Sequence, residues 1–151
     1  MKKLFSIFAI AAIAACNNTP NPETPATPPP APKKSWQGER CFALFSGKDT
    51  TVLRLMMNDS NINGNLLYNY FEKDRNMGVV EGKLTGDTII MDYSFQSEGK
   101  TSVREVAFLL KTNGIAEGHG EMKEQKGKFV FVNRSNIAFT DSPLLKRIDC
   151  R

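Results

Sequence analysis

Hydrophobic and polar residues alternate along residues 40–132 in short segments that turn-forming residues separate. Alternation with a period of two, rich in β-branched and aromatic residues, is typical of strands with one buried face. No segment keeps the 3.6-residue period of an amphipathic helix. The pattern predicts eight strands and leaves room for a short ninth at Ile137–Thr140. The eight are Arg40–Ser46, Val52–Asn58, Ile62–Phe71, Val79–Leu84, Thr88–Phe95, Val103–Lys111, Ile115–Met122 and Lys128–Val132.

The close spacing of these strands predicts the fold class. Consecutive strands joined by tight turns favour hairpins, and a run of hairpins curls into a barrel or a strongly curved sheet. We therefore expect residues 36–151 to form one all-β domain, a single antiparallel meander of about eight strands with a lipocalin-like architecture.

Two hairpin loops predict a common register. A two-residue loop at Gly86-Asp87 places Val80 opposite Tyr93, and a loop at Glu98-Gly99 places Tyr93 opposite Arg104. The same apolar face continues across all three strands. Because a one-residue slip would move every side chain to the other face, the agreement of the two loops supports this register.

The next two hairpins conflict. A loop at Asn113-Gly114 places Leu110 opposite Glu117, which turns Glu117, His119 and Glu121 inward. A loop at Lys126-Gly127 places Met122 opposite Phe131, which turns Gly118 and Gly120 inward instead. A β-bulge within 117–121 would reconcile the two loops, because one extra residue changes the phase of a strand.

The register places Arg104 on an apolar face, where a charged group needs a partner. One interpretation is a buried network with Glu117 or Glu121 as counter-ion and Tyr93 as a hydrogen-bond donor. The other is a cavity, with space supplied by glycines 64, 82, 118 and 120, that orients a small anionic or amphipathic ligand. The candidate ligand-binding residues are Tyr68, Tyr70, Tyr93, Arg104, Glu117, His119 and Glu121.

Signals for catalysis are weak. His119 is the only histidine, and along a strand its side chain would lie about 6.8 Å from those of Glu117 and Glu121. That spacing is wide for a shared metal, and no nucleophile elbow, phosphate loop or zincin motif is present. We predict no enzyme, metal site or cofactor, and keep a hydrolase or metal-dependent enzyme built on these three residues as the less favoured alternative.

The chain changes character near residue 36. Residues 1–15 begin with Lys2 and Lys3 and continue with an apolar run to Ala15, too short for a permanent transmembrane helix and typical of a secretory signal. The run Ile13-Ala14-Ala15-Cys16 resembles the lipobox at which bacterial lipoprotein signals are cleaved. That resemblance implies that Cys16 becomes the lipidated mature N-terminus. An ordinary signal with an incidental cysteine is the alternative.

Residues 16–35 are expected to be a lipidated cysteine followed by a spacer. Seven of the eight prolines lie between Pro20 and Pro32, and prolines favour an extended chain. Residues 36–151 contain 16 basic and 15 acidic side chains, so most of the net charge of +4 comes from residues 1–35. No basic stripe stands out, which argues against nucleic-acid binding.

With Cys16 assigned to lipid, Cys41 and Cys150 remain, one near each end of the domain. Both would lie in a compartment where disulfides persist. We expect them to form a disulfide. A redox role is disfavoured because the chain contains no C-x-x-C motif.

The block EKDRNMGVVEGKLTGDTIIMDYSFQSEGKTSVREVAF at residues 72–108, with EGHGEM at 117–122 and the two domain cysteines, resembles small bacterial lipoproteins of the Bacteroidetes type. The resemblance implies an outer-membrane lipoprotein and adds no catalytic residues or activity. It leaves open whether the protein faces the periplasm or the cell surface.

The sequence thus predicts a lipid-anchored cell-envelope protein that contacts the membrane through its lipid and binds a small ligand or an envelope protein. An inhibitor or other protein-interaction module is the alternative, and its candidate element is the charged loop at residues 72–77.

Overall fold

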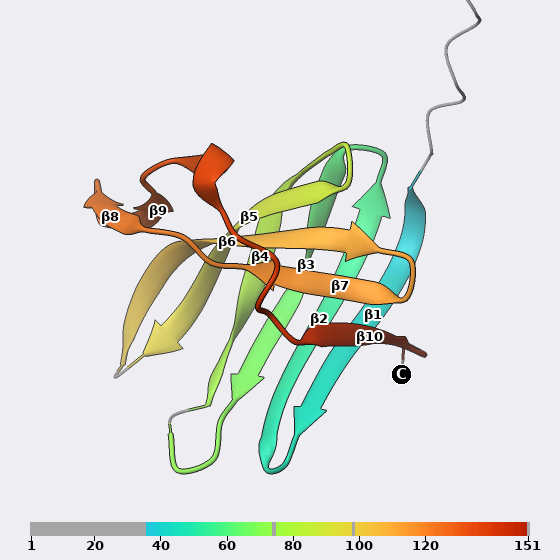
Figure 1. The fold of residues 1–151 in the computed structure, drawn as a ribbon. Coiled ribbons are helices and arrows are strands. Elements are labelled where there is room, and N and C mark those ends of the chain that lie inside the picture. The colour runs from blue at the N-terminus through green and yellow to red at the C-terminus, as the bar shows by residue number, and fades with distance from the viewer. Residues whose placement is uncertain (1–35, 74, 98, 151) are drawn as a thin grey trace, which may run out of the picture. The chain divides into compact units, whose positions relative to one another are not determined.

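The computed structural model describes residues 36–73, 75–97 and 99–150. These residues form ten β-strands and one short 3₁₀ helix, η1 (Figure 1). The elements are β1 (Gln37–Ser46), β2 (Asp49–Asn58), β3 (Asn61–Asn69), β4 (Asn76–Thr85), β5 (Thr88–Ser97), β6 (Lys100–Lys111), β7 (Gly114–Gly118), β8 (Met122–Gln125), β9 (Lys128–Phe131), η1 (Arg134–Asn136) and β10 (Leu144–Ile148).

Eight of the strands close into an antiparallel barrel, which confirms the predicted fold class. The strands β1 to β7 follow one another as a meander. β10 then lies between β7 and β1 and pairs with both, so the barrel closes at this last strand. Closure leaves no free edge along most of the barrel wall.

The predicted register of β4, β5 and β6 is confirmed. Val80 lies opposite Tyr93, and Tyr93 lies opposite Arg104. The loop at Gly86-Asp87 contains two residues, and Gly86 has a φ of +62°, the left-handed conformation that a tight hairpin turn requires at this position. Local turn chemistry therefore determined the pairing of these three strands.

The predicted pairing of the next hairpin is wrong by two residues. Leu110 lies opposite Ile115, and Glu117 lies opposite Phe108, because the loop is at residues 112 and 113 and Gly114 already belongs to β7. A Cβ atom on Gly114 would lie 2.2 Å from the carbonyl oxygen of Leu145, so this glycine permits the close approach of β10. A shift of two keeps the phase, and Glu117 remains on the inner face.

In place of the bulge predicted within residues 117–121, the structure has a break between two strands. β7 ends at Gly118, His119 forms an isolated bridge with Ala138, and β8 begins at Met122. A Cβ atom on Gly118 would lie 2.5 Å from side-chain atoms of both Ile137 and Phe139, so the returning chain packs against the break. The predicted ninth strand at 137–140 contributes only this bridge, whereas Met122 lies opposite Phe131 as predicted.

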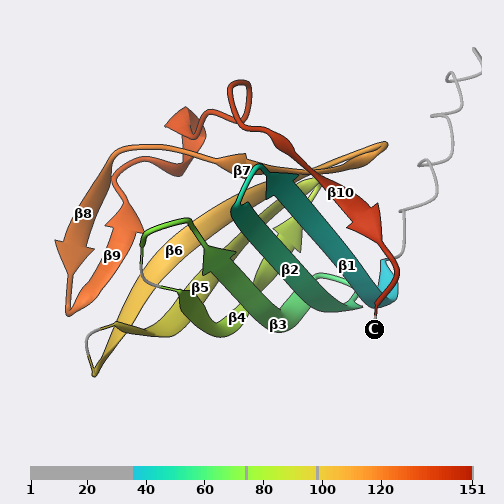
Figure 2. The same cartoon turned by 90° about the horizontal axis from the view of Figure 1, so that it is seen from below.

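The hairpin of β8 and β9 departs from a simple meander. β9 pairs with β6 in parallel, with Val103 opposite Lys128 and Arg104 opposite Phe129. Figure 2 shows β8 and β9 extending from the barrel beside β6. The sequence analysis did not predict this parallel contact.

β10 was also missed, although it carries the closing contact of the barrel. Its five residues pair with β1 on one side and with β7 on the other. The predicted disulfide between Cys41 and Cys150 is confirmed, with a Cα–Cα distance of 5.3 Å, and it joins β1 to the residues that follow β10.

The barrel interior is filled by one apolar cluster, to which every strand of the barrel contributes. The β2–β3, β4–β5 and β6–β7 turns lie at one end, which we call the turn end. Here backbone hydrogen bonds join neighbouring turns, for example from Leu84 to Ser60 and from Leu110 to Asp87. The β1–β2 turn, the β3–β4 loop and the β5–β6 turn lie at the other end, which we call the loop end (lower edge and left of Figure 1).

Candidate binding site at the loop end of the barrel

Four aromatic rings, from β3, the residue that follows it and β5, form a cluster at the loop end. Tyr68 on β3 lies 5.8 Å from Tyr70 and 5.8 Å from Tyr93 between ring centroids. Tyr93 on β5 stacks on Phe95 at 4.7 Å. The period of two along each strand brings these rings to the same face, as the sequence predicts for Tyr68, Tyr70 and Tyr93.

Arg104 packs over these rings. Its Cζ atom lies 5.3 Å from the ring centre of Tyr68, 5.8 Å from that of Tyr93 and 5.9 Å from that of Phe95. Cations over aromatic faces are attracted by the ring quadrupole. The predicted inward position of Arg104 is therefore confirmed.

The predicted counter-ion of Arg104 is wrong. Within the described part of the chain, no carboxylate lies within 4.0 Å of its guanidinium. Glu117 instead accepts a hydrogen bond from the Tyr68 hydroxyl, and Glu121 is exposed. The phenol of Tyr68 on β3 thus takes the place of the expected ion pair.

Burial raises the pKa of the tyrosines in this cluster. Burial and the negative charge of Glu117 hold the pKa of Tyr68 well above its ordinary value, against the opposing effect of Arg104. Burial raises the pKa of Tyr93 to about 12, and raises that of Tyr70, whose hydroxyl interacts with Thr51. All three hydroxyls are therefore protonated at neutral pH, and that of Tyr93 has no hydrogen-bond partner.

The loop end also concentrates buried polar atoms that have no hydrogen-bond partner. Five such side-chain atoms occur among the described residues, and four belong to this end of the barrel. They are the Tyr93 hydroxyl, Arg104 Nε, Asn76 Oδ1 and Ser142 Oγ. Buried polar groups are normally satisfied, so a cluster of unsatisfied ones requires an explanation.

A small depression opens beside this cluster. It has a volume of about 240 Å³ and brings together Tyr70, Glu117 and His119, three of the predicted site residues. Its other polar lining residues are Ser46, Asp49, Thr51 and Ser142, and neither Tyr93 nor Arg104 lines it. Glu121 does not line it, because the strand breaks before that residue.

The glycines that were expected to create an interior cavity do not leave empty space. A Cβ atom on Gly64 would lie 1.9 Å from the carbonyl oxygen of Arg54, and one on Gly82 would lie 2.1 Å from that of Ile90. These glycines let neighbouring strands coil closely around the core. Side chains fill the barrel, and the accessible space lies at its mouth.

The arrangement of acidic residues and His119 does not form a metal centre. Within the described residues, no group of three or more histidine, cysteine or carboxylate side chains is positioned to hold a metal ion. Glu117 and His119 share the depression, but Glu121 lies outside it.

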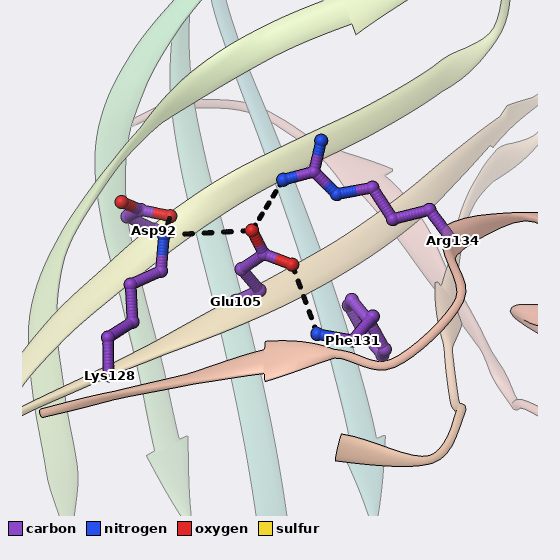
Figure 3. Close-up of polar contacts among 5 residues, drawn as sticks. All are labelled: Asp92, Glu105, Lys128, Phe131 and Arg134. Carbon is purple, nitrogen blue, oxygen red and sulfur yellow. Dashed lines mark hydrogen bonds and ion pairs between the residues drawn. The ribbon is translucent and has the colours of Figure 1, made fainter. Parts of the chain in front are cut away.

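Sequence analysis missed a second polar cluster, centred on Glu105 on the outer face of β6 (Figure 3). The side chain of Glu105 is only 3% exposed and accepts hydrogen bonds from Arg134 and from the backbone nitrogen of Phe131. Lys128 lies 3.6 Å from Glu105 and also pairs with Asp92. The cluster joins β9 and η1 to the barrel wall. In the sequence, Glu105 is a carboxylate at an outward-facing strand position, which by itself does not predict burial.

Cys16 and the predicted signal and spacer segments lie outside the described residues. In the part of the chain that the structure describes, no helix is long and apolar enough to cross a membrane. Comparisons with protein-family models, with curated proteins and with solved structures found no match.

Proposed function

We propose that this protein is a lipid-anchored cell-envelope protein whose β-barrel binds a small ligand at its loop end. The unsatisfied polar atoms of Tyr93 and Arg104 carry the proposal. Tyr93 is 0% exposed and its hydroxyl has no partner, although a hydroxyl buried without a hydrogen bond costs roughly 1–3 kcal/mol. A site that binds polar groups of a ligand accounts for this cost.

The opposite end of the barrel offers a useful contrast. Arg40 also buries an unpartnered Nε atom there and packs over Trp36 at 4.8 Å. It is the only residue of that end among the five with such atoms in the described chain. An arginine over an aromatic ring is therefore insufficient to define a site, and the grouping of donors and acceptors distinguishes the loop end.

Lipid anchoring by Cys16 supports a role at the cell envelope. The lipobox-like run Ile13-Ala14-Ala15-Cys16 precedes a proline-rich segment of the kind that acts as a spacer. The disulfide between Cys41 and Cys150 is typical of exported proteins. The anchor would keep the barrel at the membrane.

One mass-spectrometric experiment tests both parts of the proposal. The full-length protein is expressed with its signal in a Gram-negative host and extracted from membranes in mild detergent. The denatured mass should correspond to a chain that begins at Cys16 and carries a diacylglycerol and an acyl chain. A soluble or unlipidated mature chain would refute the anchor.

The native spectrum of the same material should show a bound small molecule. Arg104→Met should lose most of that molecule while retaining its fold, because a charge-assisted contact is removed. The matched control is Arg40→Met, which changes the same side chain at the turn end and should retain the ligand. Equal retention by all three proteins, or no bound molecule in wild type, would refute the ligand site.

An interaction with another protein is the second candidate function, and the outer surface favours it. A groove of about 810 Å³ on the outer face of β1 to β4 is lined by Phe45, Met77 and Ile148. Phe45 is 69% exposed and Met77 is 59% exposed. Met77 is the last residue of the segment 72–77 that the sequence analysis singled out, and in the structure it belongs to β4. A captured protein in the native spectrum, without a small molecule, would favour this candidate.

A further inference from the structure

The β8–β9 hairpin and the residues that follow it form an open pocket beside the outer face of β6. Its volume is about 660 Å³, and β6, β8, the hairpin turn, β9 and η1 all contribute side chains to its lining. Glu105 is the only acidic residue among the described residues that line it. Four of the lining residues are basic, namely Lys123, Lys126, Lys128 and Arg134.

The register of the hairpin brings these cations to one face. Lys123 lies opposite Val130 and Gln125 lies opposite Lys128, and all four residues line the pocket. Residues directly opposite each other in an antiparallel pair share a face, and neighbours along a strand alternate between faces. Glu124 therefore belongs to the other face of the hairpin, and it does not line the pocket.

The buried carboxylate of Glu105 holds two of the four cations in place. Nη2 of Arg134 donates to it at 2.5 Å, and Nζ of Lys128 lies 3.6 Å from it; Figure 3 shows the two side chains reaching Glu105 from opposite sides. Lys128 also pairs with Asp92. A guanidinium has five N–H donors, and the side chain of Arg134 is 60% exposed. Glu105 thus fixes Arg134 and leaves most of its donors available.

The other two cations are not neutralised. In the part of the chain that the structure describes, neither Lys123 nor Lys126 has a carboxylate within 4.0 Å. Glu121 lies two residues before Lys123, but it is exposed and does not line the pocket. When Glu105 and Asp92 are counted against the four cations, two positive charges remain at the pocket.

This excess charge favours an anion with more than one negative charge. A carboxylate has a single charge and two oxygen atoms. A phosphate ester carries about −1.5 to −2 at pH 7 and has three strong acceptor oxygens. It would balance Lys123 and Lys126, and it would also leave an oxygen for Arg134, whose planar guanidinium matches phosphate geometry.

The size of the pocket indicates that the phosphate is part of a larger molecule. A volume of about 660 Å³ lies within the range of roughly 300–1,000 Å³ that is usual for small-molecule sites. Val130 and Val132 add an apolar part to the lining, and Val132 is 43% exposed. Asn133 and Ser135 add uncharged polar groups. The space beside the cations therefore suits the organic part of a phosphate ester.

We propose that this pocket binds a phosphorylated small molecule or headgroup, with its phosphate held by Lys123, Lys126 and Arg134. Soluble phosphate esters and phospholipid headgroups share this chemistry, and the experiment below separates the two sources. The pocket lies on the outer wall and shares no lining residue with the loop-end depression except none of its candidate site residues, so the two sites are tested independently.

Two matched anions test the charge requirement. The full-length protein, purified in an uncharged detergent, is titrated with glycerol 3-phosphate or with acetate at the same pH and ionic strength, and amide chemical shifts report binding. Glycerol 3-phosphate should shift amides of β8, β9 and η1 and bind at least about tenfold more tightly than acetate, because it makes more charge-assisted contacts. Equal affinity for both anions would overturn the proposal.

Two double variants separate the pocket from net charge. Lys123→Gln with Lys126→Gln should weaken glycerol 3-phosphate at least about tenfold. The matched control is Lys111→Gln with Lys146→Gln, which removes the same charge from two exposed lysines that both lie opposite Gly114. The control should keep the wild-type affinity. Equal weakening in both double variants, or no weakening in the first, would show that the pocket does not hold the phosphate.

A single variant tests the role of Arg134. Arg134→Lys keeps the positive charge but removes the planar group that contacts Glu105 on one side and the phosphate on the other. Glycerol 3-phosphate should bind several-fold more weakly to this variant, and an unchanged affinity would overturn the assignment of Arg134. The melting temperature of every variant shows whether it is folded.

Micelles doped with phosphatidic acid identify the source of the phosphate. If phosphatidic acid shifts the same amides and phosphatidylcholine does not, the ligand is a lipid headgroup. If only the soluble ester shifts them, the ligand is a soluble phosphate ester. If neither shifts these amides, the proposal is wrong, and the loop-end site is unaffected.

Discussion

Tyr68 and Tyr93 place the same phenol group side by side in the barrel, yet their hydroxyls have opposite circumstances. The Tyr68 hydroxyl donates to Glu117, whereas that of Tyr93 has no partner. Both side chains are buried. Comparing the two residues therefore separates the effect of the hydroxyl on stability from the effect of the buried ring.

Tyr93→Phe should raise the free energy of unfolding by about 1 kcal/mol, because it removes a buried polar group that forms no hydrogen bond. Tyr68→Phe should lower it by roughly 1–3 kcal/mol, because a hydrogen bond to a charged group is lost. Urea denaturation of both variants measures the difference. Destabilisation by Tyr93→Phe equal to that of Tyr68→Phe would show that the Tyr93 hydroxyl has a partner in solution.

At the scale of elements, the β8–β9 hairpin depends on one buried carboxylate. β9 pairs with β6 in the sheet at only two positions, and Glu105 accepts further hydrogen bonds from Phe131 and Arg134 (Figure 3). Burial by itself raises the pKa of Glu105. The hydrogen bonds from Arg134 and Phe131, with the charges of Arg134 and Lys128, outweigh burial and hold the pKa below its ordinary value.

A lowered pKa in the folded state means that Glu105 stabilises the fold above its unfolded pKa, about 4.3. This contribution should disappear as the pH falls through the lower, folded pKa. Glu105→Gln should cost roughly 1–3 kcal/mol at pH 7 and flatten the acid side of the stability curve. Denaturation between pH 2 and 7 measures both effects, and an unchanged curve would contradict the role of this carboxylate.

The hairpin itself should respond locally. In Glu105→Gln, the amide of Phe131 should exchange hydrogen faster, whereas amides of β4 and β5 should change little. Arg54→Gln is the matched control, because it removes an exposed ion pair with Glu39 on another part of the outer wall. Such exposed pairs contribute little to stability.

At the scale of the whole molecule, the barrel closes through its last strand, which is short. β10 has five residues and joins β7 to β1. The disulfide fastens the segment after β10 to β1, across 109 residues of sequence. In the chain-entropy model, closing a loop of about 100 residues removes denatured-state entropy worth up to about 4.7 kcal/mol.

Replacing Cys41 and Cys150 together with alanine should lower the melting temperature of the oxidised protein by several degrees or more. Reduction of wild type should produce a similar loss, and reduction of the double variant should produce none. Calorimetry with and without reductant measures these changes. A melting temperature unaffected by reductant in wild type would contradict the stabilising role of the disulfide.

The sequence alone determined the features that depend on local interactions or on the number of available cysteines. Two-residue loops set the register of β4, β5 and β6, so the inward positions of Tyr93 and Arg104 followed from residue spacing. The period of two likewise placed Tyr68 and Glu117 inside. The disulfide followed from the two cysteines that remained in a chain predicted to be exported.

Only the tertiary structure decided features that depend on segments far apart in the chain. The short β10 becomes a strand because β1 and β7 provide partners on both sides, and the parallel pairing of β9 with β6 depends on the buried Glu105. The partner of Glu117 was decided in the same way. The alternation along β6 and β7 turned Arg104 and Glu117 inward, but the partners of the two groups come from β3, because the Tyr68 ring lies against Arg104 and its hydroxyl donates to Glu117. These contacts depend on how the barrel brings β3 across from β6 and β7.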